Sequence, residues 1–145
     1  MAKRTQAELE QLILATTPVY LVDTTGFSTQ NAVYVAKAKA VRRVNDGYDA
    51  AVATLVSSYP KREVDTFTKQ EREAVAWLAD NTAPTPFVDG MLVTRNIEKA
   101  ELMNRIIAKA DAFADATGQL TGKRQTLEKQ IESATTVEEV EAIQW

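Results

Sequence analysis

Pairs of carboxylates are the side chains whose spacing comes nearest to a reactive or metal-binding site. Asp111 and Asp115 are four residues apart, so on a helix they share one face and could bind a divalent cation with help from another chain. A solvated helix face is the commoner role of such a pair, and no D-x-[DN]-x-[DN]-G calcium loop occurs. Other carboxylates cluster at Glu63 and Asp65, Glu71 and Glu73, and Glu138, Glu139 and Glu141. We expect no metal site among them.

Catalysis is restricted by the residue types that the chain of 145 residues lacks. It contains no cysteine and no histidine, which excludes disulfides, thiolate or imidazole metal sites, and Cys–His or Ser–His–Asp catalysis. The stretch "GQLTGK" is no phosphate loop, because Gly118 is only four residues from Gly122 and Arg124 stands where Ser or Thr is required. An enzyme using carboxylates, Tyr48 and lysines is the remaining catalytic hypothesis, but no nucleophile–base pair has a recognisable spacing. We predict a protein that is not an enzyme, with no catalytic residue and no cofactor.

One basic cluster raises the question of nucleic acid: it consists of Lys37, Lys39, Arg42 and Arg43, with Tyr34 and Tyr48 nearby. The formal net charge of −3 argues against phosphate binding. A solvated face, or a surface against an acidic partner, is favoured. No run of 18 apolar residues exists, and Glu8 and Glu10 interrupt the apolar patch near the N-terminus. We therefore expect neither a nucleic-acid partner nor a membrane span or signal peptide, and we place synthesis in a reducing cytoplasm.

Apolar spacing and capping signals predict a mainly α fold, an antiparallel helical bundle with one long C-terminal helix. That helix is expected near 98–133 and should pack against a helix near 36–59, because apolar residues recur every three or four positions in both. Shorter helices are expected near 6–15, in the stretch after Thr68, near 86–94, and after Thr135. The expected capping boxes are Thr5–Glu8, Thr68–Glu71 and Thr135–Glu138.

The N-terminal forty residues differ in character from the rest. The run Val19 to Val22 consists of strand formers, and Asp23 to Gly26 is a turn signal. A short strand or hairpin is expected there, while residues 31–40 fit either strand or helix, with helix favoured. We predict residues 1–40 as an N-terminal docking segment and residues 41–145 as the helical bundle.

Two glycines and a tryptophan raise questions of packing. Gly118 and Gly122 each cost a helix interior roughly 0.5–1 kcal/mol relative to alanine, yet the apolar stripe passes through them in phase. They are expected to form a small-residue patch that admits a neighbouring backbone, with a local kink as the alternative. Trp77 is expected in the core. Trp145 is costly to leave in water and should pack either on the bundle or on a partner.

Residues 45–145 resemble small tail-associated proteins of tailed bacteriophages and prophages. The residues that carry the resemblance are Tyr48, Tyr59-Pro60, Lys69-Gln70-Glu71, Trp77-Leu78-Ala79-Asp80, Thr85-Pro86, Ile107-Ala108-Lys109, Gly122-Lys123-Arg124-Gln125, Leu127-Glu128 and Trp145. Such proteins are accessory or structural parts of the tail, tail-fibre or baseplate apparatus, or assist its assembly. The resemblance implies a virion protein of the tail that is assembled in the host cytoplasm, with an assembly chaperone absent from the mature particle as the alternative.

Contacts with other tail proteins are the expected mechanism. The predicted interface residues are Tyr20, Val22, Phe27, Tyr34, Gly118, Gly122 and Trp145. The longer of the two main helices would reach roughly 54 Å and the shorter roughly 36 Å. Its unmatched part needs cover from the middle helices or from another copy of the chain, so a homo-oligomer, with a trimer as one form, is a further hypothesis.

Overall fold

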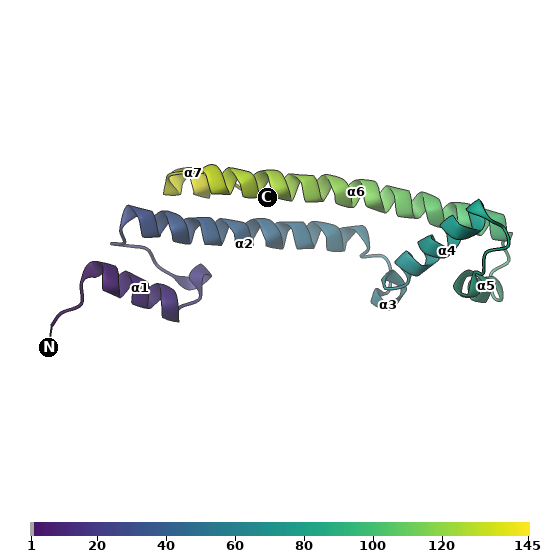
Figure 1. Cartoon of the computed structure of the whole chain (residues 1–145), viewed down its shortest axis with the longest axis horizontal. Coiled ribbons are helices and arrows are strands. Elements are labelled where there is room, and N and C mark those ends of the chain that lie inside the picture. The colour runs from purple at the N-terminus through teal and green to yellow at the C-terminus, as the bar shows by residue number, and fades with distance from the viewer. Residues whose placement is uncertain (1) are drawn as a thin grey trace. The chain divides into compact units, whose positions relative to one another are not determined.

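The structure, a computed structural model, describes residues 2–145 and is helical in every regular element of that range (Figure 1). The elements in chain order are α1 (Gln6–Thr16), the 3-10 helix η1 (Val19–Leu21), α2 (Thr29–Leu55), α3 (Lys61–Val64), α4 (Phe67–Ala79), α5 (Pro86–Leu92), α6 (Lys99–Ser133) and α7 (Val137–Glu141). The mainly α prediction is confirmed, and α6 matches the expected long helix to within a residue. It runs without a break through both glycines.

The predicted N-terminal strand is wrong. The segment forms η1, in which the Leu21 amide donates to the Pro18 carbonyl at 2.9 Å and the Val22 amide donates to the Val19 carbonyl at 3.2 Å. A strand needs a neighbour to pair its backbone groups, and residues 2–145 contain no strand that could serve as one. The ambiguous residues after Phe27 belong to α2, which begins earlier and ends earlier than expected.

The chain folds as two compact units, which we describe separately. The first unit comprises residues 2–51 and 120–145, and the second comprises residues 52–119. The boundary expected near residue 40 lies inside α2, so the N-terminal segment shares a unit with the C-terminal end of the chain.

In the first unit α2 and α6 run antiparallel. The Lys37 ammonium donates to the Glu132 carbonyl at 2.8 Å, and the hydroxyls of Tyr48 and Thr121 are 3.0 Å apart. Contacts therefore move backward along α6 as they move forward along α2. The buried residues of this core are Ala36, Ala40, Val44, Ile131, Ala134 and Val140.

In the second unit α4 and α5 pack on the beginning of α6. Its buried core consists of Ala74, Val88, Leu102, Met103 and Ile106, with Trp77 half-buried against it. These middle helices supply part of the cover that the long helix needs. The length difference between α2 and α6 therefore does not by itself require a second copy of the chain.

Helix capping follows the sequence in one of three predicted places. Thr5 and Glu8 form the expected capping box. The box expected at Thr135 is shifted by one residue, to Thr136 and Glu139. The box expected at Thr68 is wrong, because α4 already begins at Phe67.

Candidate functional site

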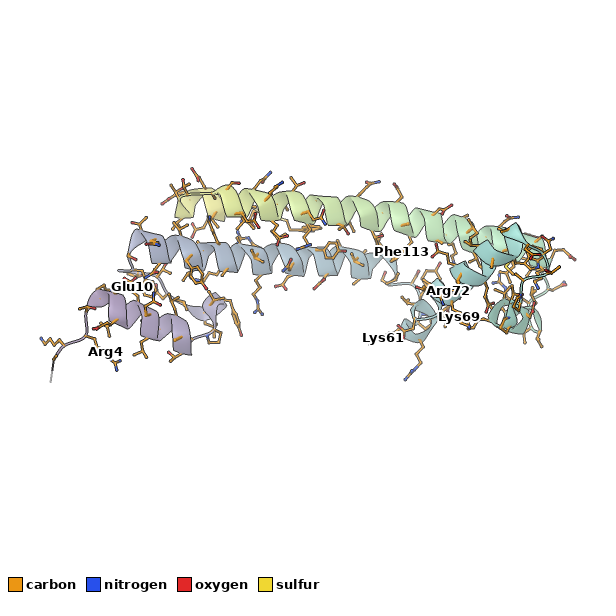
Figure 2. The ribbon with its side chains drawn as sticks, viewed as in Figure 1. Arg4, Glu10, Lys61, Lys69, Arg72 and Phe113 are labelled. Carbon is orange, nitrogen blue, oxygen red and sulfur yellow. The ribbon has the colours of Figure 1, made fainter. Side chains whose placement is uncertain are left out.

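The Glu10 carboxylate fixes the N-terminal segment to the beginning of α2. Its side chain is labelled in Figure 2, and the residue is only 1% exposed. The backbone N–H and the hydroxyl of Ser28 donate to it at 2.8 and 3.0 Å, the Gln6 amide donates at 3.1 Å, and the Asn31 amide donates to the second oxygen. A buried polar group with this many partners is satisfied, so Glu10 has a structural role.

The charge state of Glu10 agrees with that role. The hydrogen bond from Asn31 lowers its pKa most, and Gln6 and Ser28 lower it further against the opposing effect of burial, to about 2. The carboxylate also faces the N-terminal end of α2, where the helix dipole favours negative charge. A carboxylate with so low a pKa is a poor general base near neutral pH.

The basic cluster on α2 holds neighbouring segments of its own chain. On one side the Lys39 ammonium donates to the Val22 carbonyl at 2.6 Å, and the Arg42 guanidinium lies 3.8 Å from the centre of the Tyr20 ring. Arg42 also pairs with Asp46 at 3.9 Å. These contacts fasten the segment around η1 to α2.

The other two basic residues fasten the C-terminal segment. The Arg43 guanidinium donates to the Ile143 carbonyl at 2.8 Å, and Lys37 reaches the end of α6 as described above. All four side chains that sequence reasoning weighed for nucleic-acid or partner contact therefore have partners within the first unit.

The predicted interface residues near the N-terminus differ in exposure. Tyr34 is 61% exposed and Tyr20 is also exposed, whereas Phe27 is half-buried. Val22 is only 2% exposed, so a partner cannot reach its side chain without opening the unit. Leu21 lies beside it with 64% exposed and belongs with the accessible residues.

Helix α1 turns an apolar stripe outward. Leu9, Leu12 and Ile13 recur at the spacing of one helix face, and all three are exposed. Glu10 is directed to α2 instead, and Leu14 lines a hollow of about 390 Å³ together with residues of α1 and α2. Amphipathic helices usually place their apolar side inward, whereas α1 buries the carboxylate of Glu10 and leaves three apolar side chains exposed. We call the exposed side chains Leu9, Leu12, Ile13, Tyr20, Leu21 and Tyr34 the N-terminal apolar surface.

Sequence reasoning predicted a helix near 6–15 with an apolar patch, but it could not assign the direction in which Leu9, Leu12 and Ile13 point. The single signal was Glu10, which falls within the apolar patch. A carboxylate at this position can be buried only because hydrogen-bond donors such as Ser28, which lies 18 residues away, satisfy it.

Trp145 packs on the bundle, which is one of the two expected positions, and its contact with a partner stays a prediction. Its ring lies against Tyr48 with centroids 6.2 Å apart and an interplanar angle of 82°, and the Lys123 ammonium lies 4.2 Å from the ring centre. A Cβ atom placed on Gly47 would be 2.2 Å from Cγ of Trp145. Gly47 is therefore the position where a small residue admits a close neighbour.

Gly118 and Gly122 face open space within this chain. A Cβ atom on either would have nothing within 4 Å. That Gly118 and Gly122 form a small-residue patch for a neighbouring backbone stays a prediction, and the neighbour would have to belong to another molecule.

An apolar groove occupies the second unit. It has a volume of about 880 Å³, and every residue that lines it lies between Leu55 and Thr117. Tyr59 and Phe67 meet edge to face at 5.1 Å on one side, and the Lys109 ammonium lies 4.5 Å from the centre of the Tyr59 ring. Phe113, labelled in Figure 2, lines the groove from α6. We call this feature the second-unit groove; sequence reasoning did not find it.

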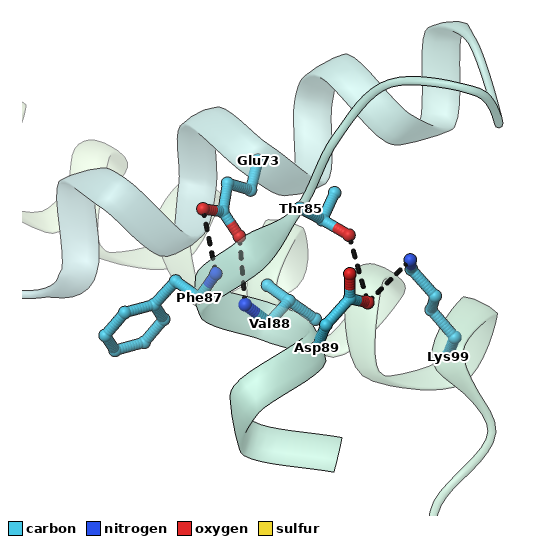
Figure 3. Close-up of polar contacts among 6 residues, drawn as sticks. All are labelled: Glu73, Thr85, Phe87, Val88, Asp89 and Lys99. Carbon is cyan, nitrogen blue, oxygen red and sulfur yellow. Dashed lines mark hydrogen bonds and ion pairs between the residues drawn. The ribbon is translucent and has the colours of Figure 1, made fainter. Parts of the chain in front are cut away.

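Glu73 and Asp89 hold α5 in place beside the groove (Figure 3). The Glu73 carboxylate accepts the backbone N–H groups of Phe87 at 3.1 Å and Val88 at 2.9 Å. Asp89 accepts Lys99 at 2.8 Å, and this bond is the main reason that its pKa lies below the ordinary value. Thr85, the residue before α5, forms no side-chain cap bond. The Glu73 carboxylate caps the helix instead.

Within residues 2–145 no group of three or more acidic side chains could hold a metal ion. None of the described helices is both long and apolar enough to span a membrane.

Comparison with known proteins gives one similarity. The family model of the HI1402 helical domain matches residues 108–145, which include the later part of α6, α7 and Trp145. The similarity concerns this segment, which is well under half of the chain. No curated protein and no solved structure matches the sequence.

Proposed function

We propose that this chain is a structural or adaptor component of a bacteriophage tail, tail fibre or baseplate, that it acts through protein–protein contacts, and that it catalyses no reaction. The proposal draws its biological setting from the resemblance of residues 45–145 to tail-associated proteins. Its mechanism draws on the outward apolar stripe of α1.

The N-terminal apolar surface is the observation that carries the proposed mechanism. Scattered exposed apolar residues are normal on proteins, whereas a contiguous stripe usually marks an interaction surface. In α1 three apolar side chains share the exposed face while a carboxylate occupies the face toward the chain's own interior. Association with a partner would remove this stripe from water, and the Glu10 contacts would keep α1 in position for that association.

A tail-assembly chaperone that leaves before the particle is complete is the second candidate. The second-unit groove favours it, because a chaperone must offer apolar surface to an incompletely assembled client. The two candidates differ in whether the chain stays in the finished virion.

Quantitative mass spectrometry of purified particles tests the proposal. Particles would be induced from the host strain that encodes the chain, and the chain would be measured against known tail proteins. A fixed ratio to those proteins is expected. Absence from particles, with co-purification of a tail or fibre protein from the lysate, would favour the chaperone; absence from both would reject the tail assignment.

Substitutions test the proposed mechanism in the same system. Leu9→Ser, Leu12→Ser and Ile13→Ser combined should abolish incorporation into particles while circular dichroism shows a folded chain. Val75→Ser with Leu78→Ser is the matched control, since both residues are exposed apolar side chains on α4. Equal incorporation of the two variants would reject the N-terminal apolar surface as the docking site.

Light scattering tests the proposed homo-oligomer separately. The homo-oligomer predicted from the sequence, with a trimer as one form, would give a mass above that of one chain at high concentration. A monodisperse monomer would remove that part of the proposal and leave the tail assignment in place.

A further inference from the structure

The second-unit groove leaves apolar side chains open to solvent. Leu102 and Ile106 at its base are buried, whereas Leu55 and Phe113 are 39% and 38% exposed. Aromatic and aliphatic groups that share one hollow lose unfavourable hydration when a partner covers them. The groove is therefore suited to burying an apolar surface that this chain does not supply.

The side of the groove that α6 forms is long and includes several small side chains. It extends from Leu102 to Thr117, a rise of about 22 Å or roughly four helical turns. Its small side chains are Ala108, Ala110, Ala112, Ala114 and Ala116. Because alternate residues of a helix point to different sides, Ala112 and Ala116 lie along one flank of Phe113, and Ala110 and Ala114 lie along the other. Phe113 stands among these alanines as the large apolar group.

The two sides of the groove carry opposite charge. Glu63 of α3 and Glu71 of α4 line one side, and neither carboxylate forms an ion pair within the described chain. The basic residues of the lining come from other elements: Arg105 and Lys109 from α6, and Arg95 from the connection between α5 and α6. Arg105 is already paired with Glu101 at 2.5 Å. Arg95 and Lys109, whose ammonium lies over the Tyr59 ring, are the lining cations that form no ion pair within the described chain.

The basic residues of α3 and α4 do not cancel this asymmetry. Lys61, Lys69 and Arg72, all labelled in Figure 2, are absent from the lining of the groove. Lys69 instead pairs with Glu73 at 3.7 Å.

We propose that the second-unit groove binds an amphipathic helix of a partner protein, with its apolar stripe on Phe113 and the alanines, basic residues along one edge and acidic residues along the other. The basic edge meets Glu63 and Glu71, and the acidic edge meets Arg95 and Lys109. A helix laid in an apolar groove is a recurrent mode of recognition. The other common mode, addition of a strand to a sheet edge, has no template in residues 2–145, which contain no strand.

A second copy of this chain offers a poorer occupant. Its most accessible apolar helix is α1, whose sequence QAELEQLILAT contains no lysine or arginine. That helix has nothing to place against Glu63 and Glu71. The charges therefore favour a different protein, and the inference stands whether or not the tail assignment is correct.

Binding of designed peptides to the full chain tests the inference. The probes are fluorescein-labelled helical peptides of about 18 residues, or five turns, with one leucine stripe. One has lysine along one edge and glutamate along the other; two others have lysine or glutamate along both edges. A fourth has the mixed edges and two central prolines, which prevent the helix. By fluorescence anisotropy, the mixed-edge peptide should bind at least about tenfold more tightly than each of the other three, because like charges oppose association.

Two chain variants locate the binding. Ala112→Trp fills the groove and should weaken binding at least about tenfold, whereas Gln119→Trp, on an exposed part of α6 outside the groove, should leave it unchanged. Glu63→Lys with Glu71→Lys makes both sides basic. Preference should then move to the peptide with glutamate on both edges, a change that nonspecific apolar association would not produce.

Several outcomes would overturn the inference. Affinities within about twofold for all four peptides would show that the charges of the groove do not select the partner. Equal binding of the proline peptide would show that the partner need not be helical. An unchanged affinity in Ala112→Trp would place the peptide elsewhere. If light scattering shows a dimer that Ala112→Trp converts to a monomer, the groove holds a second copy and the proposed partner is wrong.

Discussion

Trp145 lies so close over Gly47 that no side chain can be accommodated between them. An alanine methyl at position 47 would be 2.2 Å from Cγ and 2.6 Å from Cβ of the tryptophan. These atoms are at the root of the side chain, so a rotation about χ2 cannot relieve the overlap. The glycine in the middle of α2 is thereby explained by a residue 98 positions away along the chain.

Gly47→Ala should therefore destabilise the chain although alanine is the better helix former. Relief of helix strain would contribute about 0.5–1 kcal/mol, while overpacking costs about 1–3 kcal/mol. We expect a net decrease in the free energy of unfolding in urea. Acrylamide quenching of Trp145 in a Trp77→Phe background should increase, because the ring must move toward solvent.

Gly118→Ala is the matched control for this substitution. Nothing lies within 4 Å of its Cβ position, so it should stabilise the chain by about 0.5–1 kcal/mol. Combining Gly47→Ala with Trp145→Ala should also reverse the sign of the effect at position 47, as expected for a direct contact. Stabilisation by Gly47→Ala in the presence of Trp145 would contradict the packing described.

Local periodicity was sufficient to predict the long helix α6, although it missed α3 and misplaced both ends of α2. The three- and four-residue spacing from Leu102 to Ala134 gave a helix near 98–133, and α6 extends from Lys99 to Ser133. This succeeded because the helical period is a property of neighbouring residues. The same reasoning failed at Val19–Leu21, where strand propensity had no second strand to pair with.

The contacts that close each unit could not be predicted, because they join distant residues. The sequence marked Gly118 and Gly122 for close packing, whereas Gly47 is the glycine that a neighbour covers. Lys39 and Arg43 read as a basic cluster, but their partners lie at Val22 and Ile143. The contacts between side chains depend on which segments pack against α2. The spacing of residues along one helix contains no information about that packing.

Glu10 should make the N-terminal part of the chain sensitive to acid. Its pKa in the folded chain is about 2, below the ordinary value of 4.5. The unfolded state therefore takes up this proton first, and the contribution of Glu10 to stability is complete above about pH 4.5 and lost as the pH falls toward 2. The protection factor of the Ser28 amide, which is its hydrogen-exchange rate corrected for the intrinsic pH dependence of exchange, should fall over that range.

Glu10→Gln isolates this effect from the other carboxylates. The variant should be less stable than the native chain at pH 6, since its amide N–H₂ faces donors from Ser28 and Asn31. The difference in unfolding free energy should narrow as the pH falls from 4.5 toward 2. A difference that is constant with pH would show that the carboxylate charge does not contribute.

Glu73→Ala should weaken the attachment of α5 to α4 and so destabilise the second unit. The backbone N–H groups of Phe87 and Val88 would lose their acceptor, and an unsatisfied buried donor costs about 1–3 kcal/mol. Glu71→Ala, on an exposed position of the same helix, should change the unfolding free energy by less than about 0.5 kcal/mol. Urea unfolding and hydrogen exchange of the Val88 amide would measure both. Equal effects of the two variants would mean that Glu73 is not the cap.

The outward direction of the α1 stripe predicts an unusual tolerance of apolar truncation. Leu12→Ala removes a leucine side chain that α1 presents to solvent, so the unfolding free energy should change by less than about 0.5 kcal/mol. Ile131→Ala, in the core of the same unit, should cost about 2–5 kcal/mol because it leaves a cavity. Urea unfolding of the two variants gives the comparison. A cost at Leu12 comparable to that at Ile131 would show that the stripe is buried within the chain, and the N-terminal apolar surface would then not be available to a partner.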